Sequence, residues 1–348
     1  MYEKIVLDEI LIEVTSRCNL NCLHCFNRPS DNSVDMSLEN INYILNKSLK
    51  YGVKRVAFSG GEPFVHPEIT EIIQNCANYP DTSFLFTTNG LLLTKEFISL
   101  MRSIPNVEVQ ISIDGTTKEI YEATRGANTF SQFYKGFLLL AKSKIKTVVA
   151  RTCVSKLNYK DVEGIYKMSI ENNITPSFIF ITPQGSAVEN MEDLSLSIAQ
   201  KIHVVDTINR LNEKFNLYIA PPSMANQCDF AEDLQRKCLM VKPDGNLCPC
   251  QYYYTKNIGN IFEEDLEKIY SLDNEHLKEL YVKGKKRKEK LCKTKKCKEC
   301  KLKPTCLMGC MGLALELGNE MSFDGTCDYR VTLGSCYGNK IIKAERQV

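Results

Sequence analysis

The sequence predicts an α/β fold, a partial (β/α)6 TIM-like barrel followed by a small cysteine-rich domain with a β-hairpin and helices. Short apolar runs alternate with helical patterns through residues 1–195. The runs are apolar almost without interruption, which is typical of parallel strands buried on both faces. Six strand–helix units are too few for a closed eightfold barrel. Beyond residue 222 the rhythm stops and cysteines become dense.

Each predicted element has its own signal. The six strands are short and rich in Val, Ile or Phe, over residues 10–14, 55–58, 83–87, 107–113, 147–152 and 177–181. Apolar residues at helical spacing predict helices over 38–51, 68–78, 95–102, 130–142 and 159–172. Repeated strand–helix units imply right-handed crossovers and a parallel sheet. Further on, Pro243-Asp244-Gly245 lies between two apolar stretches and predicts a hairpin turn.

Composition divides the chain into three parts. Residues 1–195 form the barrel core, 196–222 a helix and linker, and 223–348 the cysteine-rich domain. A chain with 43% hydrophobic and 25% charged residues is an ordinary globular protein. It has no apolar run of membrane-spanning length, and its acidic N-terminus is no secretory signal. We therefore expect a cytoplasmic protein without a membrane partner.

Sixteen cysteines in such a chain predict metal or cluster ligation rather than disulfides, because the cytosol keeps thiols reduced. Cys18, Cys22 and Cys25 stand on one short stretch with the spacing C-x3-C-x2-C. Three thiolates can hold three irons of a 4Fe–4S cluster and leave the fourth open, whereas clusters that only carry electrons take four cysteines. The spacing therefore predicts chemistry at an open iron. An iron–sulfur electron carrier is the non-enzyme alternative.

Glycines and small polar residues follow the predicted strands, at the edge where parallel α/β folds bind ligands. The second strand ends in Ser59-Gly60-Gly61-Glu62-Pro63, the third in Thr87-Thr88-Asn89-Gly90 and the fourth in Ser112-Ile113-Asp114-Gly115. In order and spacing, the cysteine loop, the Gly-Gly-Glu-Pro segment and the Ser-Ile-Asp-Gly segment resemble the radical S-adenosylmethionine (SAM) superfamily.

The resemblance implies that SAM binds the open iron of the Cys18/Cys22/Cys25 cluster and is split to a 5′-deoxyadenosyl radical, which takes a hydrogen from the substrate. It also implies a set of SAM contacts. Gly60 and Gly61 let the backbone approach the SAM amino group, and Glu62 accepts a hydrogen bond from that ammonium. The His24 backbone faces adenine. The ribose hydroxyls and the SAM carboxylate are expected to be bound by Asn89, Ser112, Asp114 and Arg125.

A second cysteine pattern resembles the seven-cysteine SPASM domain, which holds two auxiliary 4Fe–4S clusters and brings the expected total to three. The resemblance implies that the first is held by Cys238, Cys250 and Cys310, and the second by Cys297, Cys300, Cys306 and Cys327. Cys228 is the expected fourth ligand of the first cluster; Cys248 and Cys292 are alternatives. A zinc ribbon is the rival for paired cysteines.

The resemblance implies a ribosomally made peptide or protein side chain as substrate, which is crosslinked or oxidised. Gln251 stands where sulfatase-maturing members have an Asp, so that activity is not expected. The first cysteine comes at position 18, without a fused leader-binding module, so a separate leader-recognition protein is allowed. The alternative substrate is a haem or tetrapyrrole precursor or another small-molecule cofactor, whose side chain is modified.

Residues 283–303 contain twelve Lys or Arg against two Glu. Such a run is either a solvated loop around the cluster cysteines or a dock for an acidic partner. A flavodoxin- or ferredoxin-type electron donor and an acidic leader peptide both qualify. Nucleic acid is not expected, because no aromatic stacking platform accompanies the run.

Overall fold

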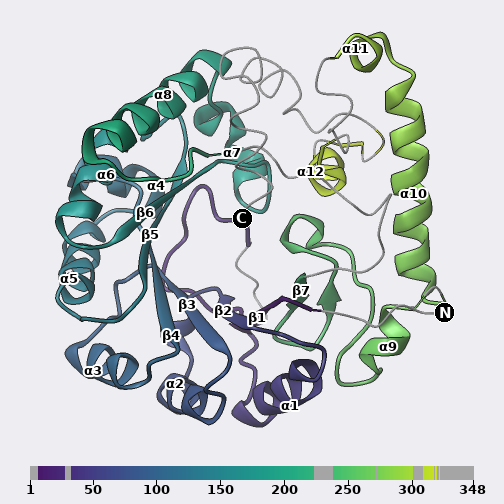
Figure 1. The fold of residues 1–348 in the computed structure, drawn as a ribbon, viewed down its shortest axis with the longest axis horizontal. Helices are drawn as coiled ribbons and strands as arrows, with labels where there is room; N and C mark the ends of the chain where they lie inside the picture. Colours follow the sequence, from purple (N-terminus) through teal and green to yellow (C-terminus); the bar gives the residue numbers. More distant parts are fainter. Residues whose placement is uncertain are drawn as a thin grey trace.

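The computed structural model describes residues 7–27, 33–222, 238–271, 273–300, 309–316, 318–319 and 321, and its dominant feature is one sheet. The eight strands lie in the order β6-β5-β4-β3-β2-β1-β7-β8. The first six are parallel to their neighbours and curve into an open barrel (Figure 1). Their bounds are β1 Glu9–Thr15, β2 Arg55–Gly60, β3 Ser83–Thr88, β4 Val107–Ser112, β5 Val148–Val154 and β6 Thr175–Phe180.

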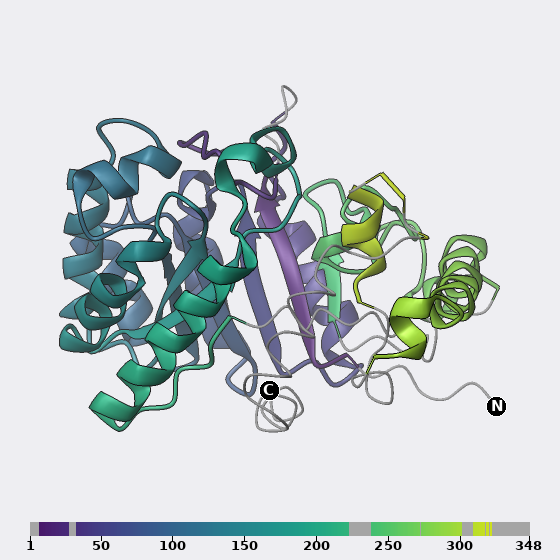
Figure 2. The ribbon, with the colours of Figure 1, turned by 90° about the horizontal axis from the view of Figure 1, so that it is seen from above.

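Helices cover the outer face of this curved sheet (Figures 1 and 2). Side-chain caps mark where several of them begin. The Ser37 hydroxyl accepts from the Asn40 N–H, Thr94 from Phe97, and Ser197 forms a reciprocal capping box with Gln200. The helices over the barrel are α1 Leu38–Leu49, α2 Ile69–Asn75, α3 Lys95–Ser103, α4 Lys118–Arg125, α5 Phe130–Ala141, α6 Val162–Glu171, α7 Ala187–Leu194 and α8 Ile198–Phe215.

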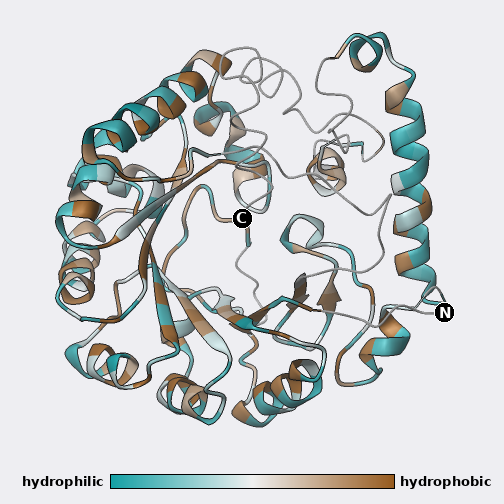
Figure 3. Cartoon of the chain, viewed as in Figure 1, coloured by the Kyte–Doolittle hydropathy of each residue, from teal (hydrophilic) through white to brown (hydrophobic). Residues whose placement is uncertain are grey.

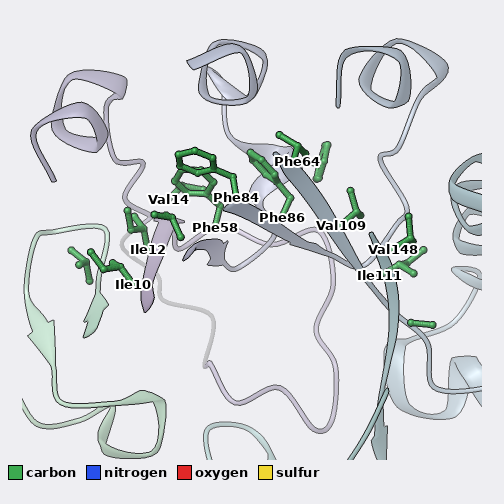
Figure 4. Packing of buried hydrophobic residues seen from close by; sticks show 14 of the residues in the cluster. Ile10, Ile12, Val14, Phe58, Phe64, Phe84, Phe86, Val109, Ile111 and Val148 are labelled. Atoms are coloured by element: carbon green, nitrogen blue, oxygen red, sulfur yellow. The ribbon is translucent and has the colours of Figure 1, made fainter. Parts of the chain in front are cut away.

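The main core lies between the strands and the outer helices (Figure 4). Phe58, Phe84 and Phe86 come from the neighbouring strands β2 and β3, and their ring centroids lie 5.7 Å (Phe58–Phe84) and 5.0 Å (Phe58–Phe86) apart. Burying each such side chain stabilises the fold by about 1.5–3 kcal/mol relative to exposure. On β1, Ile12 and Val14 point into this core (Figure 4). Because strand side chains alternate, Glu13 between them points to the inner side of the barrel.

The predicted strands and helices are confirmed, with strand ends within two residues of those observed. Two 3₁₀ turns extend predicted helices: η2 Cys76–Asn78 follows α2, and η3 Tyr159–Asp161 precedes α6. The sequence did not predict α4 and α7. Both are eight residues long and rich in polar residues, so their periodic signal is weak. The omission matters because α4 ends at Arg125, next to the candidate site.

The predicted hairpin is also confirmed. Strand β7, Cys238–Val241, pairs antiparallel with β8, Leu247–Cys248, and Gly245 in the turn has φ +83°. Its place in the fold was not expected, because β7 pairs in parallel with β1. The barrel sheet therefore continues into the hairpin, although the two lie on opposite sides of the predicted division at residue 222.

A long helix, α10 Glu275–Cys292, stands at the edge of the molecule (Figure 1). A solvated loop was one expectation for residues 283–303, and it is wrong for residues 283–292. Lys, Arg and Glu are good helix formers, and side chains at helical spacing are buried: Leu277, Leu280, Gly284, Arg287 and Leu291. Shorter helices complete this part: η5 Gln251–Tyr253, α9 Leu266–Ile269, α11 Lys295–Lys298 and α12 Met311–Glu316. In the described ranges, no helix combines the length and apolarity needed to cross a bilayer.

Candidate active site

The loop that carries the first three cysteines leaves the carboxyl end of β1 and is held by two neighbouring segments. The Leu23 N–H donates to the Thr124 carbonyl in α4 (3.0 Å), and the Ser186 N–H donates to the Cys25 carbonyl (2.8 Å). Cys22 is buried and Cys25 partly buried. Burial raises the pKa of the Cys25 thiol to about 12. A thiolate there therefore needs nearby positive charge, which iron supplies in a cluster.

The Gly-Gly segment after β2 packs directly against this loop. The Gly61 N–H donates to the Thr15 carbonyl and the Glu62 N–H to the Arg17 carbonyl, both at 2.8 Å. A Cβ added to Gly61 would lie 2.0 Å from the Arg17 carbonyl oxygen, and one added to Gly60 would lie 2.1 Å from that of Thr15. The glycines thus allow the second strand end to touch the backbone of the cysteine loop. Their approach to the SAM amino group stays a prediction.

Glu62 joins the ends of β2 and β3. Its buried carboxylate accepts from the Thr88 hydroxyl (2.8 Å), the Asn89 N–H (2.6 Å) and the Phe64 N–H (3.2 Å). Burial outweighs these donors and raises the pKa of Glu62 to about 7. The Asn89 amide in turn donates to the Asn19 side chain in the cysteine loop (2.7 Å). Two residues that the sequence assigned to SAM are therefore already linked to each other and to the loop.

A buried ion cluster joins three more predicted residues. The Arg125 Nε donates to the Asp114 carboxylate (2.6 Å), and the His24 Nε2 lies 3.1 Å from the same oxygen. The Cys153 N–H donates to the other oxygen (3.0 Å). Burial alone would raise the pKa of Asp114, but Arg125 and His24 hold it well below its usual range. Asp114 therefore carries a full negative charge inside the protein.

Arg125 also acts on the cysteine loop. Burial raises the pKa of the Cys22 thiol, and the Arg125 guanidinium opposes that rise through its charge and a hydrogen bond. The structure thus gathers His24, Asp114 and Arg125 around Cys22. Ser112 lies at the end of β4, paired with Arg151 of β5.

Sequence reasoning missed Glu13, a buried carboxylate in the middle of β1. It accepts from the Asn27 amide, just beyond the cysteine loop (2.6 Å), and from the Tyr254 hydroxyl, beyond the hairpin (3.0 Å). Lys242 of the hairpin faces it electrostatically and lies over the Tyr254 ring, 4.1 Å from the centroid. The available signal was a single acid within an apolar strand. Glu13 links the cysteine loop to the hairpin.

We expect Glu13 to make folding stability depend on pH. Burial is the main cause that raises its pKa from 4.5 to about 7, against the lowering effects of Tyr254, Lys242 and Asn27; nearby Asp244 adds a small rise. Between pH 4.5 and about 7, Glu13 binds a proton in the folded state that it has lost in the unfolded state. Stability from this group is therefore complete below pH ~4.5 and decreases by up to about 3 kcal/mol as the pH rises through ~7.

Urea unfolding of reconstituted protein between pH 5 and 8 checks this expectation. Glu13→Gln should flatten part of the slope and leave the part due to Glu62, whose pKa is raised in the same range. Glu39→Gln, an exposed carboxylate at the start of α1, is the control and should leave the slope unchanged. A Glu13→Gln profile parallel to that of the wild type would contradict this assignment.

The predicted auxiliary-cluster ligands are described only in part. Cys297 lies in α11, Cys300 follows it, and the Cys300 N–H donates to the Cys297 carbonyl (3.3 Å). A Cβ on Gly312 would meet the Tyr252 carbonyl oxygen at 2.0 Å, so α12, next to Cys310, packs on the turn that follows Cys250. Cys228, Cys306 and Cys327 lie outside the described residues, as does the side chain of Cys238. Cys248 donates to the Tyr254 carbonyl (3.2 Å), and Cys292 packs beside Leu291 and Cys297.

The residues of the cysteine loop fit a 4Fe–4S cluster and the SAM molecule that such a cluster would bind. Three thiols on one short loop are the donor set that iron–sulfur clusters take, and each would bind a different iron. The buried His24 Nδ1 has no hydrogen-bond partner within the described part of the chain, although His24 Nε2 is engaged by Asp114. Across the same residues, no three His, Cys, Asp or Glu side chains are gathered as they would be around one metal ion.

Two family models match this chain. Residues 12–169 match the radical SAM superfamily, and residues 228–301 match the iron–sulfur cluster-binding domain SPASM. The chain therefore carries a radical SAM domain followed by a SPASM domain, and its cofactors are SAM and 4Fe–4S clusters.

Individual relatives are similar over part of their length. The mycofactocin maturase MftC of Mycobacterium ulcerans is 26% identical over 203 residues, 58% of this chain and 55% of that protein. The subtilosin biosynthesis protein AlbA of Bacillus subtilis is 26% identical over 270 residues, 74% of this chain and 58% of AlbA. The GTP 3′,8-cyclase of Petrotoga mobilis is 28% identical over 185 residues, 51% of this chain and 57% of the cyclase. The chain spans little more than half the length of these curated relatives.

The fold is shared with a peptide-bound structure. SuiB of Streptococcus suis, bound to the precursor peptide SuiA, has a TM-score of 0.73 at 17% identity. The match covers 92% of this chain and 76% of SuiB. At that identity the likeness concerns the architecture, the open barrel followed by a cysteine-rich part.

Proposed function

We propose that this protein is a radical SAM/SPASM enzyme that modifies a side chain of a ribosomally made peptide or protein. One observation carries the proposal: the C-x3-C-x2-C loop lies at the carboxyl end of β1, between the Gly60-Gly61 backbone and α4. Cys18, Cys22 and Cys25 would hold the cluster, which with SAM bound would supply a 5′-deoxyadenosyl radical for hydrogen abstraction from the substrate.

Residues of the chain itself position the cysteine loop and place charge beside it. Arg125 places a buried positive charge beside Cys22, and Asp114, which His24 also contacts, holds the guanidinium there. Glu62 fixes the end of β3, so that Asn89 stays beside the cysteine loop. We assign Gly60, Gly61, Glu62, His24, Asn89, Ser112, Asp114 and Arg125 to the surroundings of SAM. The eight remaining predicted cysteines, Cys228 among them, are assigned to two auxiliary clusters.

A peptide substrate is favoured by the names of the relatives. MftC is a maturase, AlbA belongs to bacteriocin biosynthesis, and SuiB is bound to a precursor peptide. The small-molecule alternative is supported by the GTP 3′,8-cyclases. Mass spectrometry of candidate precursor peptides co-expressed with the enzyme decides between them. A loss of two mass units in a peptide supports the first proposal, and unaltered peptides together with a modified nucleotide or tetrapyrrole support the second. A flavodoxin or ferredoxin is the proposed electron donor, and a separate leader-recognition protein is a proposed partner.

Cys22→Ala tests the radical chemistry. We expect 5′-deoxyadenosine release from SAM under dithionite to be abolished, because the cluster loses a ligand. Iron content should fall from roughly twelve to roughly eight per chain, since only one of three 4Fe–4S clusters is lost. Cys76→Ala, which removes a buried thiol in the core beside α2, is the control and should keep both iron and cleavage. Twelve irons per chain in Cys22→Ala would contradict the ligand assignment. If the wild-type protein with all its clusters released no 5′-deoxyadenosine, the result would favour the electron-carrier alternative.

A further inference from the structure

The second half of α10 and the short α11 form a strongly basic surface, called here the basic face. Residues 285–299 contain nine Lys or Arg against two Glu. Lys286, Lys290 and Lys293 are exposed, and their spacing of four and three residues places them on one side. The opposite side of α10 is buried through Leu280, Gly284, Arg287 and Leu291. Figure 3 shows α10 as hydrophilic along most of its length.

The helix macrodipole does not account for this charge. Lysines near a helix C-terminus gain about 0.3–1 kcal/mol from the macrodipole, but only within the last turn. Lys286 lies well before that turn, and Lys286 and Lys290 repel each other at i, i+4 spacing. A short loop then leads to α11, whose exposed residues continue the same charge with Lys295, Lys296 and Lys298. The macrodipole therefore explains only the lysines of the last turn of α10 and not the whole basic face.

The position of the basic face points to electron transfer. Cys297 is buried within α11 and packs with Leu291 and Cys292 of α10. Cys297 and Cys300 are proposed ligands of the second auxiliary cluster, so the exposed lysines of α11 flank one of these ligands directly and precede the other. Figures 1 and 2 place α10 on the far side of the molecule from α3, α5 and α6.

We infer that the basic face docks an acidic one-electron carrier protein of the flavodoxin or ferredoxin type beside Cys297 and Cys300. This inference rests on the proposed function. Cys297 and Cys300 would hold the cluster that accepts single electrons from the reduced carrier, and no covalent bond would be made or broken. A peptide substrate must reach the barrel, whereas a carrier needs only to come close to a cluster. Complementary charge speeds such encounters and makes them sensitive to salt.

The test compares two reductants on the reconstituted full chain. Release of 5′-deoxyadenosine from SAM is driven either by dithionite or by a bacterial flavodoxin kept reduced by its NADPH-dependent reductase. The variant is the triple change Lys286→Glu, Lys290→Glu and Lys293→Glu. The matched control is Lys142→Glu, Lys144→Glu and Lys146→Glu, which changes three exposed lysines before β5 by the same charge.

We expect the variant on the basic face to lose at least about tenfold of the flavodoxin-driven rate at low salt, and to become insensitive to added salt. Its dithionite-driven rate and iron content should match the wild type, and the control should behave as the wild type throughout. Equal losses in both triple variants, a parallel loss with dithionite, or an unchanged flavodoxin-driven rate would each overturn the docking proposal. Loss of RNA binding with an unchanged flavodoxin-driven rate would assign the face to nucleic acid instead. Absent dithionite-driven cleavage in the wild type refutes the proposed function and not the docking alone.

Discussion

Replacing Asp114 by asparagine should lower the free energy of unfolding by about 3–5 kcal/mol, because it leaves a buried guanidinium without its counter-charge. Asp114 is fully buried. Its carboxylate accepts hydrogen bonds from the Arg125 Nε and the Cys153 N–H and contacts the His24 ring. Asparagine keeps the shape and one carbonyl acceptor but loses the charge. Because Arg125 is only 8% exposed, water can offset little of the lost counter-charge. We therefore expect SAM cleavage to fall together with stability.

Urea unfolding of the anaerobically reconstituted protein measures the change, with the iron content of the folded fraction as a second readout. Glu163→Gln is the matched control. Glu163 also pairs with two cations, Lys167 and Arg210, but all three side chains are about one-third exposed or more. Surface pairs contribute only about 0–1 kcal/mol, so the control should move the midpoint little. A similar shift in both variants would contradict the claim that the buried Asp114–Arg125 pair matters more for stability than a surface ion pair.

The elements that could be predicted from the sequence are those with local signals. The six strands are continuous apolar runs, and the two adjacent residues Asp244-Gly245 are enough to indicate a turn. The pairing of β7 with β1 has no such signal. The two strands are more than 200 residues apart in the sequence, so they pair only once the rest of the chain has folded. The same reason hid the contact of Glu13 with Tyr254, which lies 241 residues further along the chain.

At the candidate site, the structure brings together residues that the sequence patterns singled out, but the patterns did not predict their mutual contacts. Asp114 and Arg125 were both assigned to SAM, and the structure joins them to each other. Arg125 reaches Asp114 from the end of α4, a helix too short and polar to be recognised by periodicity. Glu62 was expected to serve the SAM ammonium, and its oxygens are engaged by the end of β3. Spacing locates such residues at strand ends, whereas hydrogen-bond partners require the backbone positions of neighbouring strands.

Gly61→Ala should abolish SAM cleavage while leaving most of the fold intact. A Cβ at this position would lie 2.0 Å from the Arg17 carbonyl oxygen, 2.4 Å from its carbon and 2.9 Å from the Cys18 nitrogen. These are backbone atoms, so no rotamer change relieves the clash, and the cysteine loop must move. Overpacking of this kind costs about 1–3 kcal/mol. The displaced loop carries Cys18, so we expect the SAM-binding cluster to be lost and iron to fall by roughly four per chain.

The matched control is Gly52→Ala, which separates the clash from the general cost of losing a glycine. Gly52 has φ +89° and open space where its Cβ would lie. Alanine there costs about 1–2 kcal/mol through the left-handed backbone conformation alone. We therefore expect a comparable loss of stability in the two variants but full iron and SAM cleavage in Gly52→Ala only. Retention of all iron and of SAM cleavage in Gly61→Ala would mean that the cysteine loop does not depend on this contact, and that the two glycines serve SAM alone.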